Sequence, residues 1–179
     1  MRGSYITMVM IDFIKDEVIK EAINGVIEEY ASPSANRENK LKNMYANEVA
    51  YWAYKLLEQK HLVTQAAQQT FVDLIIGAAL IHNIFIDEES EDAPYMVFEA
   101  RKKLTGYFRE KGLPEDFAGY IFKIVESQYG EDSPIPEVRP TPDTPQAIIA
   151  TAKFIVNHLE EYDRWYIDTF YPEAREDNE

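Results

Sequence analysis

The chain has 179 residues, of which 46% are apolar and 28% are charged, a size and composition typical of one globular domain. It contains no cysteine, which excludes zinc ribbons, thiol catalysis and disulfide scaffolds. The 18 basic and 32 acidic residues give a formal net charge of −14, which argues against direct binding to nucleic acid. No stretch is long and apolar enough to span a bilayer, so we expect a cytoplasmic protein with no membrane contact.

Apolar residues recur at spacings of three and four along the whole chain, which predicts an all-α fold. We expect about six main helices, over residues 11–30, 37–59, 64–86, 94–110, 114–130 and 144–170. Residues 1–7 are interpreted as a vector leader or a disordered start, and residues 172–179 as a flexible acidic tail. Between them, residues 8–171 are expected to form a single domain.

Local signals predict several helix boundaries. Ser32-Pro33-Ser34 and Gly112 are expected to end the first and fourth helices. Asp143, with a glutamine three residues later, is typical of a capping box at the start of the last helix. Val18 and Leu41 are expected on the buried faces of the first two helices.

Three polar residues stand out in apolar surroundings. The third predicted helix is apolar on every side over residues 74–81, and it ends in His82 and Asn83, which need partners or a function there. One interpretation is a hydrogen-bonded core histidine followed by a C-terminal capping asparagine. In the last helix Lys153 borders an apolar stripe. Either its methylenes follow the core edge with the ammonium in water, or it is buried and pairs with Tyr45, Asn83 or a carboxylate.

The third predicted helix ends in Ala78-Ala79-Leu80-Ile81-His82-Asn83-Ile84. This segment resembles the HD-domain metal-dependent phosphohydrolases, in which an apolar helix ends in Ala-Ala-Leu-Leu-His-Asp-Ile. Further landmarks of that family match Val49-Ala50, the segment 124–130 before a proline-rich loop, and Ala152 to Ile155. The resemblance covers about residues 37–160 and implies an HD-like bundle, with the second, third, fifth and sixth helices around the site.

The resemblance implies a degenerate metal site. Where the family has metal ligands, this chain has Tyr45 for His, Asn83 for Asp, Gln128 for His and Lys153 for Asp, and only His82 remains. Imidazole and carboxylate groups hold the metal and orient its water in such sites. Lys153 would also bring a positive charge toward the position of the metal ion. At about 4 Å, two like charges repel by about 4 kcal/mol at an effective dielectric constant of about 20. We therefore expect no catalytic residue and no cofactor; if a metal ion binds, His82 and Asn83 would hold it.

A degenerate HD protein with this net charge is expected to be a binding or regulatory protein, and small HD proteins occur in bacteria and their phages. Its partner should carry a basic surface or be another copy of the chain. The expected interface joins aromatic anchors to the acids Glu160, Glu161 and Asp163, and the anchors are Trp165, Tyr166, Phe170 and Tyr171. Alternatively, these aromatic side chains dock onto the chain's own core.

Two enzymatic alternatives remain open. The first is an active nucleotide phosphohydrolase using Mn, Co or Mg, with Asp73, Asp87 or Asp143 in place of the lost ligands. The second is similar to the MazG-type pyrophosphatases, whose paired acids hold magnesium. The matching pairs here are Glu88 with Glu91 and Glu160 with Asp163.

Overall fold

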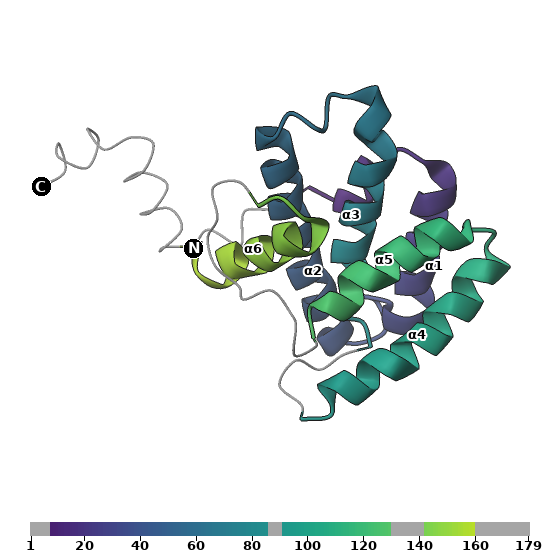
Figure 1. Cartoon of the computed structure of the whole chain (residues 1–179). Helices are drawn as coiled ribbons and strands as arrows, with labels where there is room; N and C mark the ends of the chain where they lie inside the picture. Colours follow the sequence, from purple (N-terminus) through teal and green to yellow (C-terminus); the bar gives the residue numbers. More distant parts are fainter. Residues whose placement is uncertain (1–7, 86–90, 130–141, 160–179) are drawn as a thin grey trace, which may run out of the picture.

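A computed structural model of the chain describes residues 8–85, 91–129 and 142–159. Over these residues it contains six α-helices and no strand, which confirms the predicted all-α fold (Figure 1). In chain order the elements are the 3₁₀-helix η2 (Met10–Phe13), α1 (Glu17–Ala31), α2 (Arg37–Gln59), the 3₁₀-helix η3 (Ala66–Gln68), α3 (Gln69–Ile81), α4 (Ala93–Glu110), α5 (Glu115–Ser127) and α6 (Pro145–Asn157).

Where a single helix was expected over residues 11–30, the structure has two elements, η2 and α1. A short extended linker, residues 14–16, separates them. Asp16 caps α1, because its side chain accepts two backbone N–H groups of the first turn. The backbone N–H groups of Lys15 and Asp16 in turn donate to the Asp73 carboxylate, at 3.1 and 3.0 Å. Donation to Asp73 holds the linker out of the helix, so α1 begins only at Glu17.

The helix α3 lies at the centre of the fold. Every residue from Val72 to Ile81 is buried, and α3 packs against α1, α2 and α5. It is shorter than the expected 64–86, because residues 66–68 form η3 and His82 is the C-cap residue. One hydrophobic cluster contains buried residues from all six α-helices.

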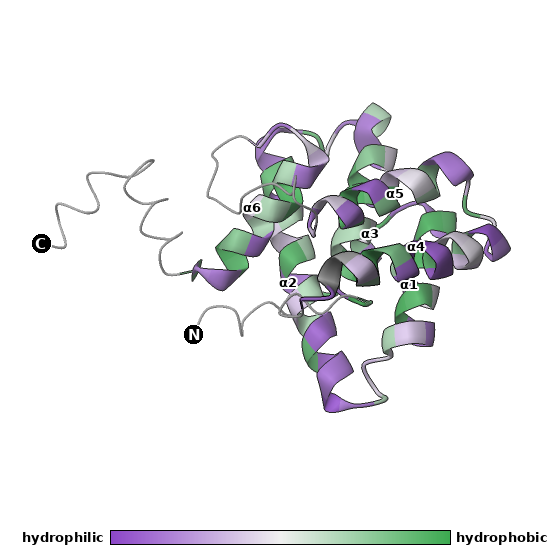
Figure 2. Cartoon of the chain, turned by 60° about the horizontal axis from the view of Figure 1, so that its bottom comes forward, coloured by the Kyte–Doolittle hydropathy of each residue, from purple (hydrophilic) through white to green (hydrophobic). Residues whose placement is uncertain are grey.

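Two residues expected on buried faces are exposed. Val18 is 46% exposed, because the late start of α1 leaves it in the first turn beside the cap. Leu41 is 52% exposed, because it precedes the buried part of α2, whose first buried residue is Ala46. The N-terminal end of α2 extends beyond the other helices and is polar (Figure 2).

The last helix, α6, starts one residue later than expected. Thr144, not Asp143, is the N-cap, and its hydroxyl oxygen accepts the N–H of Ala147 at 3.1 Å. A hydroxyl can therefore cap this helix without a carboxylate, and Pro145 follows at the first helical position, which suits proline. The described part of α6 ends at Asn157, so the predicted continuation to residue 170 lies outside the described residues. α6 packs mainly on α2, whereas α4 packs on α5 and α1 on the other side of the molecule (Figure 1).

Candidate functional site

Four side chains meet where α2, α3, α5 and α6 converge, and we call them the His82 cluster: Tyr45, His82, Tyr129 and Lys153. The rings of Tyr45 and His82 have their centroids 6.0 Å apart. The Tyr129 hydroxyl donates to the backbone carbonyl of His82 at 2.8 Å. The Lys153 ammonium lies 5.1 Å from the centroid of the Tyr129 ring. Tyr129 therefore links two predicted site residues, His82 and Lys153, and the third, Tyr45, lies against His82.

His82 is 1% exposed and occupies the C-terminal end of α3. Its Nδ1 lies 2.6 Å from the carbonyl oxygen of Ala79, one turn earlier on the same helix. In the neutral imidazole this contact places the proton on Nδ1 and makes Nε2 the acceptor atom. The histidine thus satisfies a carbonyl of the last turn of α3.

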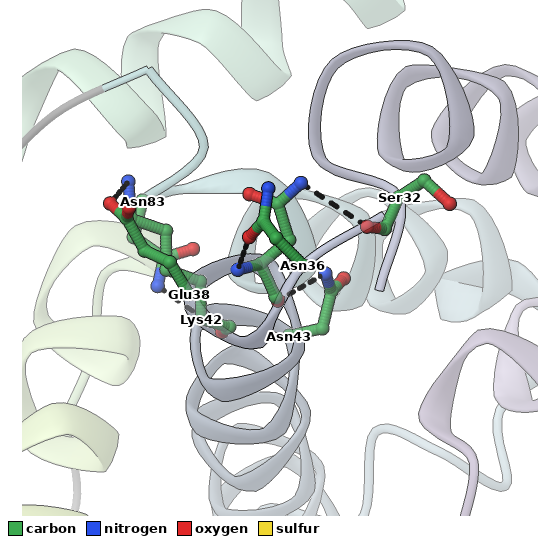
Figure 3. A network of polar contacts seen from close by, with 7 residues as sticks. Ser32, Asn36, Glu38, Lys42, Asn43 and Asn83 are labelled. Carbon is green, nitrogen blue, oxygen red and sulfur yellow. Dashed lines mark hydrogen bonds and ion pairs between the residues drawn. The ribbon is translucent and has the colours of Figure 1, made fainter. Parts of the chain in front are cut away.

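Asn83 does not cap α3, contrary to one sequence interpretation. His82 is the C-cap residue, and the Asn83 Nδ2 donates instead to the backbone carbonyl of Lys42 on α2, at 3.3 Å (Figure 3). Asn83 is 7% exposed, and its Oδ1 finds no hydrogen-bond partner among the described residues. The side chain therefore ties the residues after α3 to α2, and its oxygen is its only group that a cation could use.

Asn83 lies near a second set of amide contacts that fixes the turn between α1 and α2 (Figure 3). Asn36 caps α2 by accepting the N–H of Asn39 at 2.7 Å. The Asn39 Nδ2 donates to the carbonyl of Ser32, and the Asn43 Nδ2 donates to the carbonyl of Ala31 at 2.7 Å. These bonds satisfy carbonyls at the end of α1, so this part of α2 has a structural role.

Gln128 is directed toward α6. It is the C-cap residue of α5, and its Nε2 lies 3.2 Å from both the Gln146 carbonyl and the Ser127 hydroxyl. Gln146 belongs to the first turn of α6, so Gln128 links the end of α5 to the start of α6. The neighbouring Tyr129, which sequence reasoning missed, contacts both His82 and Lys153. Its only sequence signal is its place after Gln128 in the segment that carries the family resemblance.

Lys153 is buried, with 7% of the residue exposed. Of its two interpretations, the structure therefore favours the buried lysine over one whose ammonium reaches water. One contact of its ammonium is with the Tyr129 ring, which was not among the expected partners. A cation–π contact of this kind contributes about 2 kcal/mol when it is removed from water. The positive charge lies among the residues where the resemblance would place a metal ion.

Of the proposed replacement carboxylates, the two that the structure describes, Asp73 and Asp143, do not join the His82 cluster. Asp73 is fully buried, but it lies nine residues before His82 on α3, about 13 Å along the helix axis. Its oxygens accept from the backbone of Lys15 and Asp16 and from the Gln69 side chain. Asp143 is exposed. Within the described ranges no three His, Asp or Glu side chains come close enough to hold a metal ion.

The remaining predicted residues lie outside the described ranges. These are Asp87, Glu88 of the first MazG-type pair, both members of the second pair (Glu160 and Asp163), Glu161, and the aromatic anchors Trp165, Tyr166, Phe170 and Tyr171. Glu91, the other member of the first pair, is described and exposed.

The donor set of the His82 cluster does not fit a divalent metal ion. It offers one imidazole, two phenols and an ammonium, with the Asn83 amide beside them. A catalytic divalent ion needs several imidazole or carboxylate ligands, and a buried ammonium opposes its charge. What the cluster supplies is a set of contacts that joins four helices.

Comparison with known proteins adds no relative: no family model, curated protein or solved structure matches this chain. The similarity to HD-domain proteins stays an expectation based on the residues quoted above. Among the described helices, none is long and apolar enough to cross a membrane.

Proposed function

We propose that this chain is a non-catalytic, HD-like binding or regulatory protein of phage or bacterial type, working in the cytoplasm, in which the His82 cluster occupies the former metal position. The observation that carries the proposal is the buried ammonium of Lys153, 5.1 Å from the Tyr129 ring centroid. Phosphohydrolysis of the HD type requires a metal ion that acidifies and positions a water molecule. A fixed positive charge where that ion would bind is incompatible with the reaction.

The hydrogen bonds around His82 support the same proposal. The Tyr129 hydroxyl donates to the His82 carbonyl, and the Asn83 amide donates to the Lys42 carbonyl. Both contacts use side chains to satisfy buried backbone acceptors, which is a structural task. A binding role then has to reside on the surface, and a net charge of −14 favours association with a basic partner or a basic surface of a second copy.

Restoring the ligands tests this proposal directly. We would titrate the full chain, purified without chelator, with Mn²⁺ by calorimetry. The matched variant carries Tyr45→His, Asn83→Asp, Gln128→His and Lys153→Asp. We expect no stoichiometric binding by the natural chain and micromolar or tighter binding by the variant, provided its circular dichroism spectrum is unchanged.

Three results would count against the proposal. Sub-micromolar stoichiometric Mn²⁺ binding by the natural chain would overturn the degenerate site. Hydrolysis of nucleoside mono- or triphosphates with Mn²⁺ or Co²⁺, abolished by His82→Ala, would establish the enzyme. A folded variant that binds no metal would show that these positions do not form an HD-type site.

A further inference from the structure

A groove between α4 and α5 differs in charge from the rest of the protein. It has a volume of about 440 Å³, within the range of about 300–1,000 Å³ usual for binding pockets. Leu104, Phe108 and Phe122 contribute apolar surface to it. Its charged lining consists of exposed Arg101, Arg109 and Lys123 together with exposed Glu115 and Glu126. An apolar floor whose rim has more cations than acids suits a ligand that is both apolar and anionic.

A basic stretch of α4 borders this groove, and two of its residues, Arg101 and Arg109, line it. Residues 101–111 hold five basic residues and one acidic residue, which gives this stretch a net charge of +4 in a chain of net charge −14. The Arg101 guanidinium lies 5.1 Å from the centroid of the Phe122 ring, and Arg109 lies 3.6 Å from Glu115. The cations are thus held beside the apolar surface of the groove.

The complementary chemistry occurs in the same chain, directly after α6. Residues 160–179 hold eight acidic and two basic residues, so this segment has a net charge of −6. It also contains five aromatic residues, Tyr162, Trp165, Tyr166, Phe170 and Tyr171. Aromatic anchors surrounded by acids match an apolar floor whose rim has an excess of cations, in both hydrophobicity and the sign of the net charge.

The arrangement of the helices decides between the chain's own segment and that of a second copy. α6 packs on α2, and α4 packs on α5 and α1. The end of α6 and the α4–α5 pair lie on opposite sides of the molecule in both views (Figure 1, Figure 2). A segment that begins at α6 of one copy therefore starts on the far side from its own groove. Three of its aromatic residues, up to Tyr166, lie within seven residues of Leu159, a length that spans at most about 25 Å. A second copy can present all the aromatic residues to the groove without crossing the molecule.

We propose that the α4–α5 groove of one copy binds the acidic aromatic segment 160–179 of a second copy. This inference rests on the proposed binding function and identifies the partner as the chain itself. Reciprocal exchange of the two segments closes a dimer, since each copy supplies one groove and one segment. The contact is weakened by salt, because the charges on the groove rim are exposed.

Two glycines provide a matched pair of steric variants. Gly119 lines the groove on α5, and a Cβ at this position would meet no atom within 4 Å. Gly106 on α4 has the same open surroundings but does not line the groove. Gly119→Phe should therefore fill the groove without disturbing the core, and Gly106→Phe should leave the groove open.

The test is the mass of the full chain in solution, measured by light scattering and sedimentation at about 50 and 500 mM NaCl. We expect dimers at low salt, and at least a tenfold increase of the dimer dissociation constant in Gly119→Phe but not in Gly106→Phe. A chain that stays monomeric at low salt would overturn the inference, as would a dimer that Gly119→Phe leaves unchanged. Neither result bears on metal binding, so the degenerate site is judged separately.

Charge reversal identifies the occupant. One variant carries Arg101→Glu and Lys123→Glu, and the other carries Glu160→Lys, Glu161→Lys and Asp163→Lys. Each variant alone should be monomeric, because its groove and its segment then carry charges of the same sign. The mixture should form a heterodimer, because each groove then meets a segment of opposite charge. Failure of the mixture to associate would overturn the assignment of segment 160–179. So would binding of a labelled oligonucleotide that Lys123→Glu abolishes, because it would assign the groove to nucleic acid.

Discussion

Replacement of Asp73 by asparagine should destabilise the fold by detaching the linker before α1 from α3. Asp73 is 0% exposed. Its Oδ1 accepts from the Lys15 N–H at 3.1 Å and from the Gln69 Nε2 at 2.8 Å, and its Oδ2 accepts from the Asp16 N–H at 3.0 Å. Asp73→Asn preserves the shape of the side chain but turns one acceptor oxygen into an NH₂ donor. One N–H group that now donates to Asp73 then faces another donor.

The size of the effect follows from these bonds. A hydrogen bond to a charged group contributes about 1.5–3 kcal/mol, and a buried donor left without an acceptor costs about 1–3 kcal/mol. Relaxation of the linker toward water recovers part of this loss, so we expect Asp73→Asn to lower the free energy of unfolding by about 3 kcal/mol. In a protein of this size, 1 kcal/mol shifts Tm by about 2–4 °C, so Tm should fall by about 6–12 °C.

Urea denaturation followed by circular dichroism measures this difference, and Asp12→Asn is the matched control. Asp12 pairs with Lys20 at 3.4 Å, but its side chain is 68% exposed. An exposed ion pair contributes about 0.5 kcal/mol or less, so the control should stay close to the natural chain. If Asp73→Asn also stays within about 0.5 kcal/mol, the Asp73 carboxylate does not anchor the linker and this reasoning is wrong.

Three further predictions concern close packing, backbone conformation and ionisation. Gly25→Ala should lower the free energy of unfolding by about 1–3 kcal/mol, because the new Cβ collides with the Tyr107 hydroxyl, and Tyr107→Phe should recover part of the loss. His61→Gly should raise Tm, because His61 has a left-handed φ of 59°, and Gly112→Ala should lower it, because Gly112 has a φ of 76°. Burial raises the pKa of Tyr120 to about 12. The unfolded chain releases this proton near its ordinary pKa of 10, so stability should fall between about pH 10 and 12, and less so in Tyr120→Phe.

Each of these predictions has a contrary outcome. Additive losses for Gly25→Ala and Tyr107→Phe in the double variant would show that the two residues do not collide. An unchanged Tm for His61→Gly would mean that the left-handed conformation carries no strain in histidine. A Tyr120→Phe variant that loses stability at alkaline pH as steeply as the natural chain would remove Tyr120 as the cause.

Helix boundaries were predicted well where the signal is local. The expected second helix coincides with α2, and the expected end of the fourth helix lies at the end of α4, before Gly112. Both α2 and α4 end in the same way, with a residue of left-handed φ followed by a residue whose N–H returns to the helix. At the end of α2 the N–H of Leu62 donates to the carbonyl of Leu57, and at the end of α4 that of Leu113 donates to that of Phe108.

Boundaries set by distant partners were not predictable. The expected helix over residues 11–30 satisfies every local rule, yet it breaks at Lys15 and Asp16, whose N–H groups donate to Asp73, more than 50 residues away in the sequence. The sequence offered Asp73 only as a possible replacement metal ligand and could not identify its backbone partners. A buried carboxylate can equally accept backbone N–H groups or bind a metal ion, and only the fold distinguishes these uses.

The candidate site shows the same division between local pattern and tertiary contact. Spacing and resemblance singled out Tyr45, His82 and Lys153, which the fold brings into one cluster, but they did not single out Tyr129. A tyrosine next to a glycine has no distinctive pattern, and its importance comes from the two contacts it makes. Its hydroxyl satisfies a carbonyl at the end of α3, and its ring receives the ammonium from α6.

In HD enzymes the metal ion holds helices together through its ligands, as the resemblance implies, and loss of the ligands would leave a polar gap in the core. Under the proposed function Tyr129 closes that gap. It joins α3 to α6 through one hydrogen bond and one cation–π contact, each compatible with a buried environment because the donor and the cation both have partners. The same two contacts would oppose a return of the metal ion, since the ammonium repels it and the hydroxyl is already used by a backbone carbonyl. Stability without metal and inability to bind metal then have one physical cause.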